Sequence, residues 1–251
     1  MYANYIKLAL RNMAKNRLYA LINIVGLAIG LTIFLLSSIL AHYERNHDSV
    51  FAQRDRIFTA GSVFAPEADI TVLETDSIYT AIAPLIRNEV TDIEAIARTV
   101  RREFLVSIGG GADSYYQTIT FADEDLTRIF DFDYLYGDAG AISDPTAIIL
   151  SASVAEKFFG RSDVVGEVLS LDHRQDLRVA AVIADVPSDS HFSTAINSEP
   201  DSLVFAPLTV LEKIEDTRFA ENWNYLSMGD MTYMLLPEGA GRQWLEQQLN
   251  A

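Results

Sequence analysis

The 251-residue chain contains no cysteine, and this absence removes a whole class of chemistry. Without thiols the protein has no disulfides, thiolate nucleophiles, zinc–thiolate sites or iron–sulfur clusters. Histidine is scarce, and its four positions show neither H-E-x-x-H nor another paired metal-ligand spacing: His42, His47, His173 and His191. The sequence therefore predicts no metal site and no cofactor.

Motifs of hydrolases and nucleotide-binding proteins are missing too. Asp189, Ser190 and His191 are the residue types of a hydrolytic triad, but three consecutive loop residues cannot place a base against a nucleophile, and no G-x-S-x-G turn is present. The only glycine cluster, 109–111, lacks the lysine of a phosphate-binding loop. We therefore do not expect an enzyme.

Basic residues are few and unevenly placed. The chain has 19 Lys and Arg against 35 Asp and Glu; four of the basic residues lie in 1–17, and residues 42–251 hold 15 basic and 35 acidic residues, a net charge of −20. Such an acidic part repels phosphate backbones, so no nucleic-acid partner is expected. Five of its acidic residues cluster without the spacing of an EF-hand loop, which favours a solvated acidic surface: Asp123, Glu124, Asp125, Asp131 and Asp133.

Residues 18–41 form the one long hydrophobic run, 24 residues without a charged side chain. A helix of this length measures about 36 Å and can cross a hydrocarbon core of about 30 Å. A buried core helix is the first alternative, but such helices are rarely apolar on all sides. A cleaved signal peptide is the second, but its apolar region is normally shorter, and in Ile39-Leu40-Ala41 a large residue, Ile39, stands three positions before any cut. We predict a single transmembrane helix.

The flanking charges predict the orientation of this helix. Lys7, Arg11, Lys15 and Arg17 precede it, and positive residues remain on the cytoplasmic side. Residues 42–251 are therefore expected outside the cytoplasm, in the periplasm if the protein lies in the inner membrane of a Gram-negative cell. The first three basic residues repeat at i, i+4 and i+8, which predicts an amphipathic helix lying among the lipid headgroups, or else a simple charged flank that needs no helix.

Two glycines within the hydrophobic run are four residues apart. Gly26 and Gly30 form a G-x-x-x-G pattern, which lets two transmembrane helices approach closely. Because the pattern is short and common, incidental glycines remain the alternative.

The remaining 210 residues predict an α+β fold, with strands and helices interleaved in one large domain or two lobes. Hydrophobic periodicity and capping residues predict helices at 78–90 (starting nearer 81, because of Pro84), 123–130, 152–159 and 242–249. Ser151 and Gly160 are expected to cap the third helix. Strands are expected at 56–64, 95–108, 115–121, 147–150, 168–171, 177–186, 204–207 and 232–236.

Short segments follow one another in a characteristic order. They are N-Y-I-K-L-A-L-R-N at 4–12, N-R-L at 16–18, L-I-N-I-V-G-L-A-I-G at 21–30, D-R-I-F at 55–58, D-L at 125–126, I-F-D-F at 129–132, Y-G-D at 136–138, D-P-T-A-I-I-L-S at 144–151, A-E-K-F-F-G at 155–160, V-G-E-V-L at 165–169, A-V-I-A-D-V-P at 181–187 and S-H-F at 190–192. In order and spacing they resemble the MacB/FtsX-type ABC transporter permeases. The resemblance implies a cytoplasmic amphipathic elbow helix (1–17), a transmembrane helix (18–41) and a MacB-like periplasmic core domain (42–251).

The resemblance also implies a function. Such a permease is a non-enzymatic membrane subunit whose partners are the lipid bilayer, a separate cytoplasmic ABC ATPase, a second permease subunit in a homo- or heterodimer, and a periplasmic protein or lipoprotein. Permeases of this family continue with further transmembrane helices, so we expect this sequence to be a fragment or a truncated product. The alternative is a single-pass, membrane-anchored sensing or binding domain that works without an ATPase.

Overall fold

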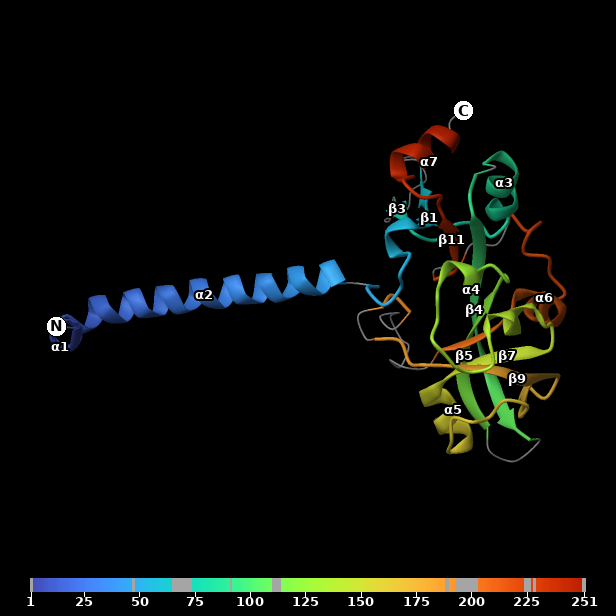
Figure 1. Ribbon diagram of the computed structural model, residues 1–251, viewed down its shortest axis with the longest axis horizontal. Coiled ribbons are helices and arrows are strands. Elements are labelled where there is room, and N and C mark those ends of the chain that lie inside the picture. Colours follow the sequence, from blue (N-terminus) through green and yellow to red (C-terminus); the bar gives the residue numbers. More distant parts are fainter. Residues whose placement is uncertain are drawn as a thin grey trace. The chain divides into compact units, whose positions relative to one another are not determined.

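The chain divides into two compact units, Met1–His47 and Asp48–Ala251 (Figure 1). The computed structural model describes residues 2–46, 48–64, 74–90, 92–109, 114–187, 190–192, 203–223, 227 and 229–249.

The first unit consists of two helices, α1 (Tyr2–Lys15) and α2 (Arg17–Asn46). They are separated by a bend at Asn16, where Arg17 Nε donates a hydrogen bond to the Ala14 carbonyl oxygen (3.1 Å). A basic side chain at this position satisfies a carbonyl that the end of α1 leaves without a helical partner. The predicted helix before the hydrophobic run is therefore present, and the charged flank is helical.

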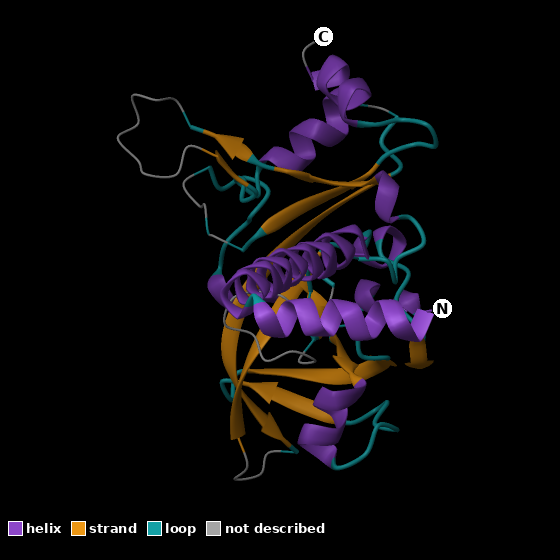
Figure 2. Cartoon of the chain, turned by 90° about the vertical axis from the view of Figure 1, so that its left-hand side faces the viewer, coloured by secondary structure: helices purple, strands orange, loops and turns teal. Residues whose placement is uncertain are grey.

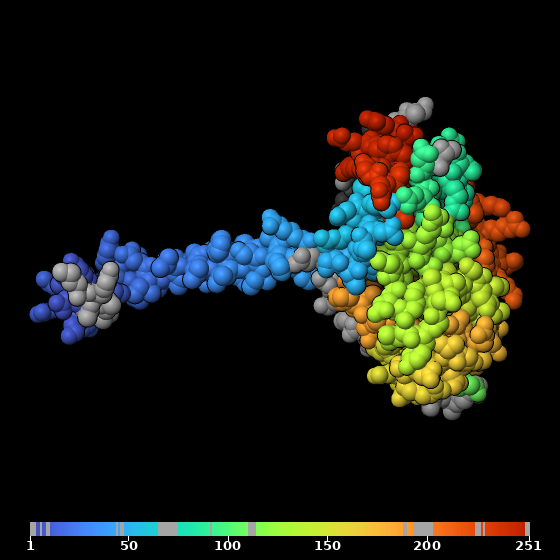
Figure 3. All heavy atoms as spheres, in the orientation of Figure 1, coloured from blue at the N-terminus to red at the C-terminus, as the bar shows by residue number. Residues whose placement is uncertain are grey.

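Helix α2 is the long apolar helix that the sequence predicts. Its stretch Arg17–Tyr43 has a mean hydropathy of 2.5, and none of its most apolar window is buried. Figure 3 shows the side chains of α2 in blue on the surface of the first unit. A buried core helix is thereby excluded, whereas the length and composition suit a bilayer crossing.

The second unit is built on a nine-stranded mixed sheet. Across the sheet the order is β1 (Ile57–Ala60), β11 (Met231–Leu235), β4 (Ala95–Ile108), β5 (Ser114–Ala122), β10 (Val204–Pro207), β7 (Ala147–Ser151), β9 (Gln175–Ile183) and β6 (Tyr134–Tyr136). Among the strand pairs of the described residues, only β5–β10 and β7–β9 are parallel. A separate two-stranded ribbon pairs β2 (Ser62–Val63) with β3 (Glu74–Thr75) (Figure 2).

The ninth strand, β8 (Val168–Leu171), closes part of the sheet into a ring. It pairs with β9 on one side and with the end of β4 on the other, where Val106 lies opposite Leu171. The hydrogen-bonded path β4-β5-β10-β7-β9-β8 therefore returns to β4. Closure leaves these strands without free edges, while β1 and β6 continue the sheet outside the ring.

Helices cover the sheet and enclose three hydrophobic cores. The helices are α3 (Ile82–Glu89), α4 (Leu126–Ile129), α5 (Ala152–Phe159), α6 (Leu208–Glu215) and α7 (Arg242–Leu249), with 3₁₀ turns η1 (Arg54–Arg56) and η3 (Ala139–Ser143). The first core joins the ring to α5 and α6, the second lies beneath α4, and the third lies beneath α3 and α7. Strand β4 supplies residues to all three, such as Val100, Ala97 and Ile96. Of the two predicted arrangements, a single integrated domain is the one observed.

Most predicted elements are present, and the differences are local. Ser151 is the N-cap residue of α5, as predicted, but its side chain makes no capping hydrogen bond. Asp185 instead accepts hydrogen bonds from the backbone N–H (3.1 Å) and hydroxyl (2.7 Å) of Ser153. Gly160 ends the helix in the left-handed conformation, as expected. Strand β6 and helix α6 are absent from the prediction.

Candidate functional site

The predicted membrane-interface residues lie on one exposed face or at the bend. Lys7, Arg11 and Lys15 are exposed on α1, and Arg17 opens α2. The first acidic residue of the chain is Glu44, so this part carries only positive charges. The arrangement suits anionic headgroups, but binding there stays a prediction.

Gly26 and Gly30 lie on the exposed surface of α2. A Cβ atom added at either glycine would meet no atom within 4 Å, so the first unit itself places nothing against them. Nearby, the Thr32 hydroxyl donates to the Ala28 carbonyl oxygen at 2.8 Å, which satisfies this polar group within the helix. Helix packing at the two glycines stays a prediction.

The residues that looked like a triad instead gather around Asp48, the first residue of the second unit. Asp48 Oδ1 accepts hydrogen bonds from the Ser190 hydroxyl (3.0 Å), from the backbone N–H of His191 (3.0 Å) and from His191 Nδ1 (2.8 Å). His191 Nε2 lies 3.0 Å from the Tyr233 hydroxyl. Asp189 lies outside the described residues.

This geometry is not that of a nucleophile and its base. The Ser190 hydroxyl bonds to the carboxylate instead of the imidazole, and the far ring nitrogen is occupied by a phenol. Because a carboxylate can only accept, His191 Nδ1 carries a proton and donates it to Asp48, while Nε2 faces the Tyr233 hydroxyl. The arrangement satisfies every bond within the group and exposes no activated oxygen.

The surroundings of Asp48 and Tyr233 shift the pKa values of both groups. Burial alone would raise the pKa of Asp48, but the hydrogen bonds and charge of His191, together with Ser190, lower the pKa of this carboxyl below its ordinary value. Burial, reinforced by the negative charge of Asp48, raises the pKa of Tyr233. At neutral pH Asp48 is therefore ionised and the Tyr233 hydroxyl keeps its proton.

Aromatic rings surround the polar group. Phe51, only 2% exposed, contacts Phe130 edge to face with ring centroids 5.0 Å apart. The centroid of the His191 ring lies 4.1 Å from the ring centroid of Phe192 and 5.5 Å from that of Tyr233. Such packing shields the hydrogen bonds in part, because the side chains of His191 and Asp48 remain 25% and 22% exposed.

Residues 48–56, which we call the lead segment, are bonded to several distant parts of the domain. The backbone N–H of Ala52 donates to the Asp131 carboxylate (3.2 Å), and Arg56 donates through Nε to the Leu236 carbonyl oxygen (2.8 Å) and forms an ion pair with Glu94. The lead segment then continues into β1, which pairs with β11 in antiparallel register. The chain that follows α2 is thus attached directly to the sheet.

Of the acidic residues between 123 and 133, two are paired with arginine side chains. Asp123 binds Arg98 through both carboxylate oxygens at 2.8 Å, and these bonds outweigh burial and raise the pKa of Arg98. Asp125 pairs with Arg87 and is half-buried like Asp123, whereas Glu124, Asp131 and Asp133 are exposed, as the predicted solvated surface requires. In the described ranges no group of three or more His, Asp or Glu residues could hold a metal ion.

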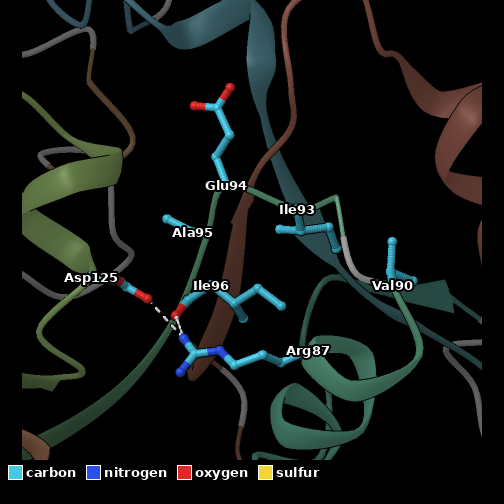
Figure 4. A pocket seen from close by; sticks show the side chains of 7 residues that line it. All are labelled: Arg87, Val90, Ile93, Glu94, Ala95, Ile96 and Asp125. Atoms are coloured by element: carbon cyan, nitrogen blue, oxygen red, sulfur yellow. Dashed lines mark hydrogen bonds and ion pairs between the residues drawn. The ribbon is translucent and has the colours of Figure 1, made fainter.

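A small pocket lies between α3 and the start of β4 (Figure 4). Its volume is about 220 Å³, and it is lined by Arg87, Val90, Ile93, Glu94, Ala95, Ile96 and Asp125. Figure 4 shows the Arg87 guanidinium directed at the Ile96 carbonyl oxygen (2.7 Å) and at Asp125 (2.8 Å). The walls hold no nucleophile, and the cation is paired with an anion, so the pocket offers no catalytic arrangement.

Known proteins share this architecture. The family model of the MacB-like periplasmic core domain matches residues 20–251. No curated protein matches the chain. Among solved structures, a domain from Porphyromonas gingivalis described as part of a permease is 21% identical, with a TM-score of 0.61, over 80% of this chain and 81% of that one.

Two further structures share the fold. The periplasmic region of MacB from Actinobacillus actinomycetemcomitans is 10% identical, with a TM-score of 0.53, over 77% of this chain and 80% of that one. The extracellular domain of the noncanonic ABC-type transporter YknZ from Gram-positive bacteria is 14% identical, with a TM-score of 0.51, over 76% and 88%. Together with a family match that spans nearly the whole sequence, they show that the chain belongs to the MacB-like periplasmic core domain family of ABC transporter permeases.

Proposed function

We propose that the chain is the membrane subunit of an ABC transporter in which a separate cytoplasmic ATPase drives movement of the periplasmic domain. This movement of the periplasmic domain would serve export, extraction or signalling. The observation that carries the proposal is the direct succession of an unburied apolar helix, Arg17–Tyr43, and a MacB-like domain. A periplasmic domain needs a membrane-spanning helix if an ATPase on the cytoplasmic side of the membrane is to move it.

The proposed location is the bacterial inner membrane, with the N-terminus in the cytoplasm and residues 42–251 in the periplasm. The four basic residues before the apolar run and the acidic bulk after it support this orientation. In the same proposal α1 lies in the cytoplasmic headgroup layer, with Lys7, Arg11 and Lys15 toward lipid phosphates. Gly26 and Gly30 are the contact for another transmembrane helix, in a homo- or heterodimer of permeases. A periplasmic protein or lipoprotein would contact the domain.

Single cysteines test the orientation cleanly because the chain has none of its own. We expect Ala52→Cys to react with a membrane-impermeant maleimide in intact spheroplasts, and Asn12→Cys to react only after permeabilisation. Both side chains are exposed, so accessibility within the protein does not limit labelling. The reverse pattern, or equal labelling of both positions, would refute the proposed orientation.

A second experiment separates a transporter subunit from an anchored sensing domain. The chain has no ATP-binding motif, so any ATPase activity must come from a bound partner. We expect the chain purified from its native membrane in mild detergent to carry vanadate-sensitive ATPase activity. A preparation that retains the folded chain and lacks this activity would support the sensing alternative instead.

A further inference from the structure

Three segments that are far apart in the sequence meet at the carboxylate of Asp48. We propose that Asp48, Ser190, His191 and Tyr233 form a latch that fixes the lead segment to strand β11, so that a displacement of residue 48 moves β11 with it. The latch consists of four hydrogen bonds, three on Asp48 Oδ1 and one between His191 Nε2 and Tyr233.

The backbone at Asp48 shows that the latch holds a defined conformation. Asp48 has φ +56°, in the left-handed region, which non-glycine residues adopt at some cost although aspartate tolerates it. The turn is closed by the backbone N–H of Phe51, which donates to the Asp48 carbonyl oxygen at 3.1 Å. Such a conformation persists where the surroundings determine it, and here three donors on one oxygen do so.

The other end of the latch lies in the interior of the sheet. Tyr233 is 4% exposed, and its backbone pairs with Thr59 of β1 on one side and with Ala97 of β4 on the other. The hydroxyl therefore bonds the His191 ring from the middle strand of three. A force applied at Asp48 reaches β11 through side chains as well as along β1.

These residues act as positioning residues, because they hold the lead segment and touch no ligand. Their use in transport depends on the proposed function, since only a moving membrane helix would load the latch. The mechanical connection itself does not depend on it and can be measured without any ATPase.

Local hydrogen exchange on the full 251-residue chain in detergent tests the connection. His191→Phe keeps a ring against Phe130 and Phe192 and removes both side-chain bonds. We expect amides in 48–56 to exchange about ten-fold faster, as loss of one or two net hydrogen bonds implies, and amides of β4 to change less than about two-fold. The matched control is Tyr134→Phe, which removes a buried hydroxyl that has no hydrogen-bond partner in the described structure, and it should change neither region.

A distance measurement provides the second readout. Spin labels on Ala52→Cys and Glu238→Cys, both exposed, report the lead segment and the turn after β11. We expect one narrow distance distribution in the parent chain and in the control Tyr134→Phe, and a broader one with His191→Phe or Tyr233→Phe. If both latch variants keep the narrow distribution and slow exchange, the latch does not exist; if β4 exchange rises as much as that of 48–56, the residues serve overall stability alone.

Discussion

Tyr233 and Tyr134 form a matched pair for mutation, because one hydroxyl has a hydrogen-bond partner and the other has none in the described structure. Tyr233 and Tyr134 both have hydroxyls in protected surroundings, and burial raises the pKa of each, that of Tyr134 to about 12 with help from the negative charge of Asp138. The Tyr233 hydroxyl bonds His191 at 3.0 Å, whereas the Tyr134 hydroxyl is buried with no hydrogen-bond partner in the described structure. Removing each hydroxyl therefore tests whether partnered and unpartnered groups contribute with opposite sign.

The expected magnitudes follow from the partners. Tyr233→Phe removes one hydrogen bond and leaves His191 Nε2 without its partner, which should lower the free energy of unfolding by about 1–2 kcal/mol. Tyr134→Phe removes a polar atom that lost its water on folding and gained nothing, so stability should stay unchanged or rise by up to about 1 kcal/mol. The two variants should differ by about 2 kcal/mol, or about 30-fold in the unfolding equilibrium.

Urea unfolding of the full chain in detergent micelles can measure this difference. Both tryptophans, Trp223 and Trp244, lie in the domain, so their fluorescence follows the domain and not the membrane helix. The transition slopes should stay equal, because neither variant changes the surface that unfolding exposes. Equal losses of stability in the two variants would refute the reasoning, since hydrogen bonding could then not explain either one.

Two other predictions concern acid and backbone strain. Because the fold lowers the pKa of Asp48, its stabilising effect is complete above the ordinary carboxyl pKa of about 4 and is lost as the pH falls through the lower folded value; the urea midpoints of the parent chain and Asp48→Asn should therefore differ at pH 6 and converge near pH 2, and an unchanged gap would contradict the assignment. Gly137 has φ +75° and a Cβ there would overlap the carbonyl oxygen of Ala180, whereas Gly166 has φ +97° and open space around it. Gly137→Ala should thus cost about 3 kcal/mol and Gly166→Ala about 1 kcal/mol in thermal or urea unfolding, and equal costs would show that the contact is irrelevant.

The sequence predicted those helices and strands whose bounds are set by residues within or next to them. Alternation and a following glycine turn give β4 its observed bounds, Ala95–Ile108, and the turn residue Gly109 has φ +55°. Helix α3 begins at Ile82, so that Pro84 lies in its first turn, where a missing N–H costs nothing. The strands predicted at 168–171 and 177–186 are present as β8 and β9, which pair in antiparallel register.

Elements that depend on distant partners could not be predicted in this way. Helix α6 begins directly after Pro207, with no polar cap to announce it, and its apolar residues Leu208 and Leu211 follow strand β10 without a break in hydrophobicity. Strand β6 has only three residues and exists because β9 lies beside it. Ser151 occupies the predicted N-cap position of α5, but the side chain that accepts a hydrogen bond from the first turn is Asp185, more than thirty residues away.

The same distinction holds for the candidate site. A 24-residue run without charge predicts the long apolar helix α2 from composition alone. The partners of Asp48 lie 142 and 143 positions away, and no periodicity relates them. The S-H-F segment at 190–192 was visible as part of the family pattern, but its contact with Asp48 follows only from the fold.

The pairing of β1 with β11 has a consequence for folding during synthesis of the chain. Ile57 lies opposite Leu235, so the first strand of the domain acquires this neighbour only after residues 231–235 have been synthesised. Until then the nascent chain carries an open backbone ladder at β1, a state prone to associate with other chains.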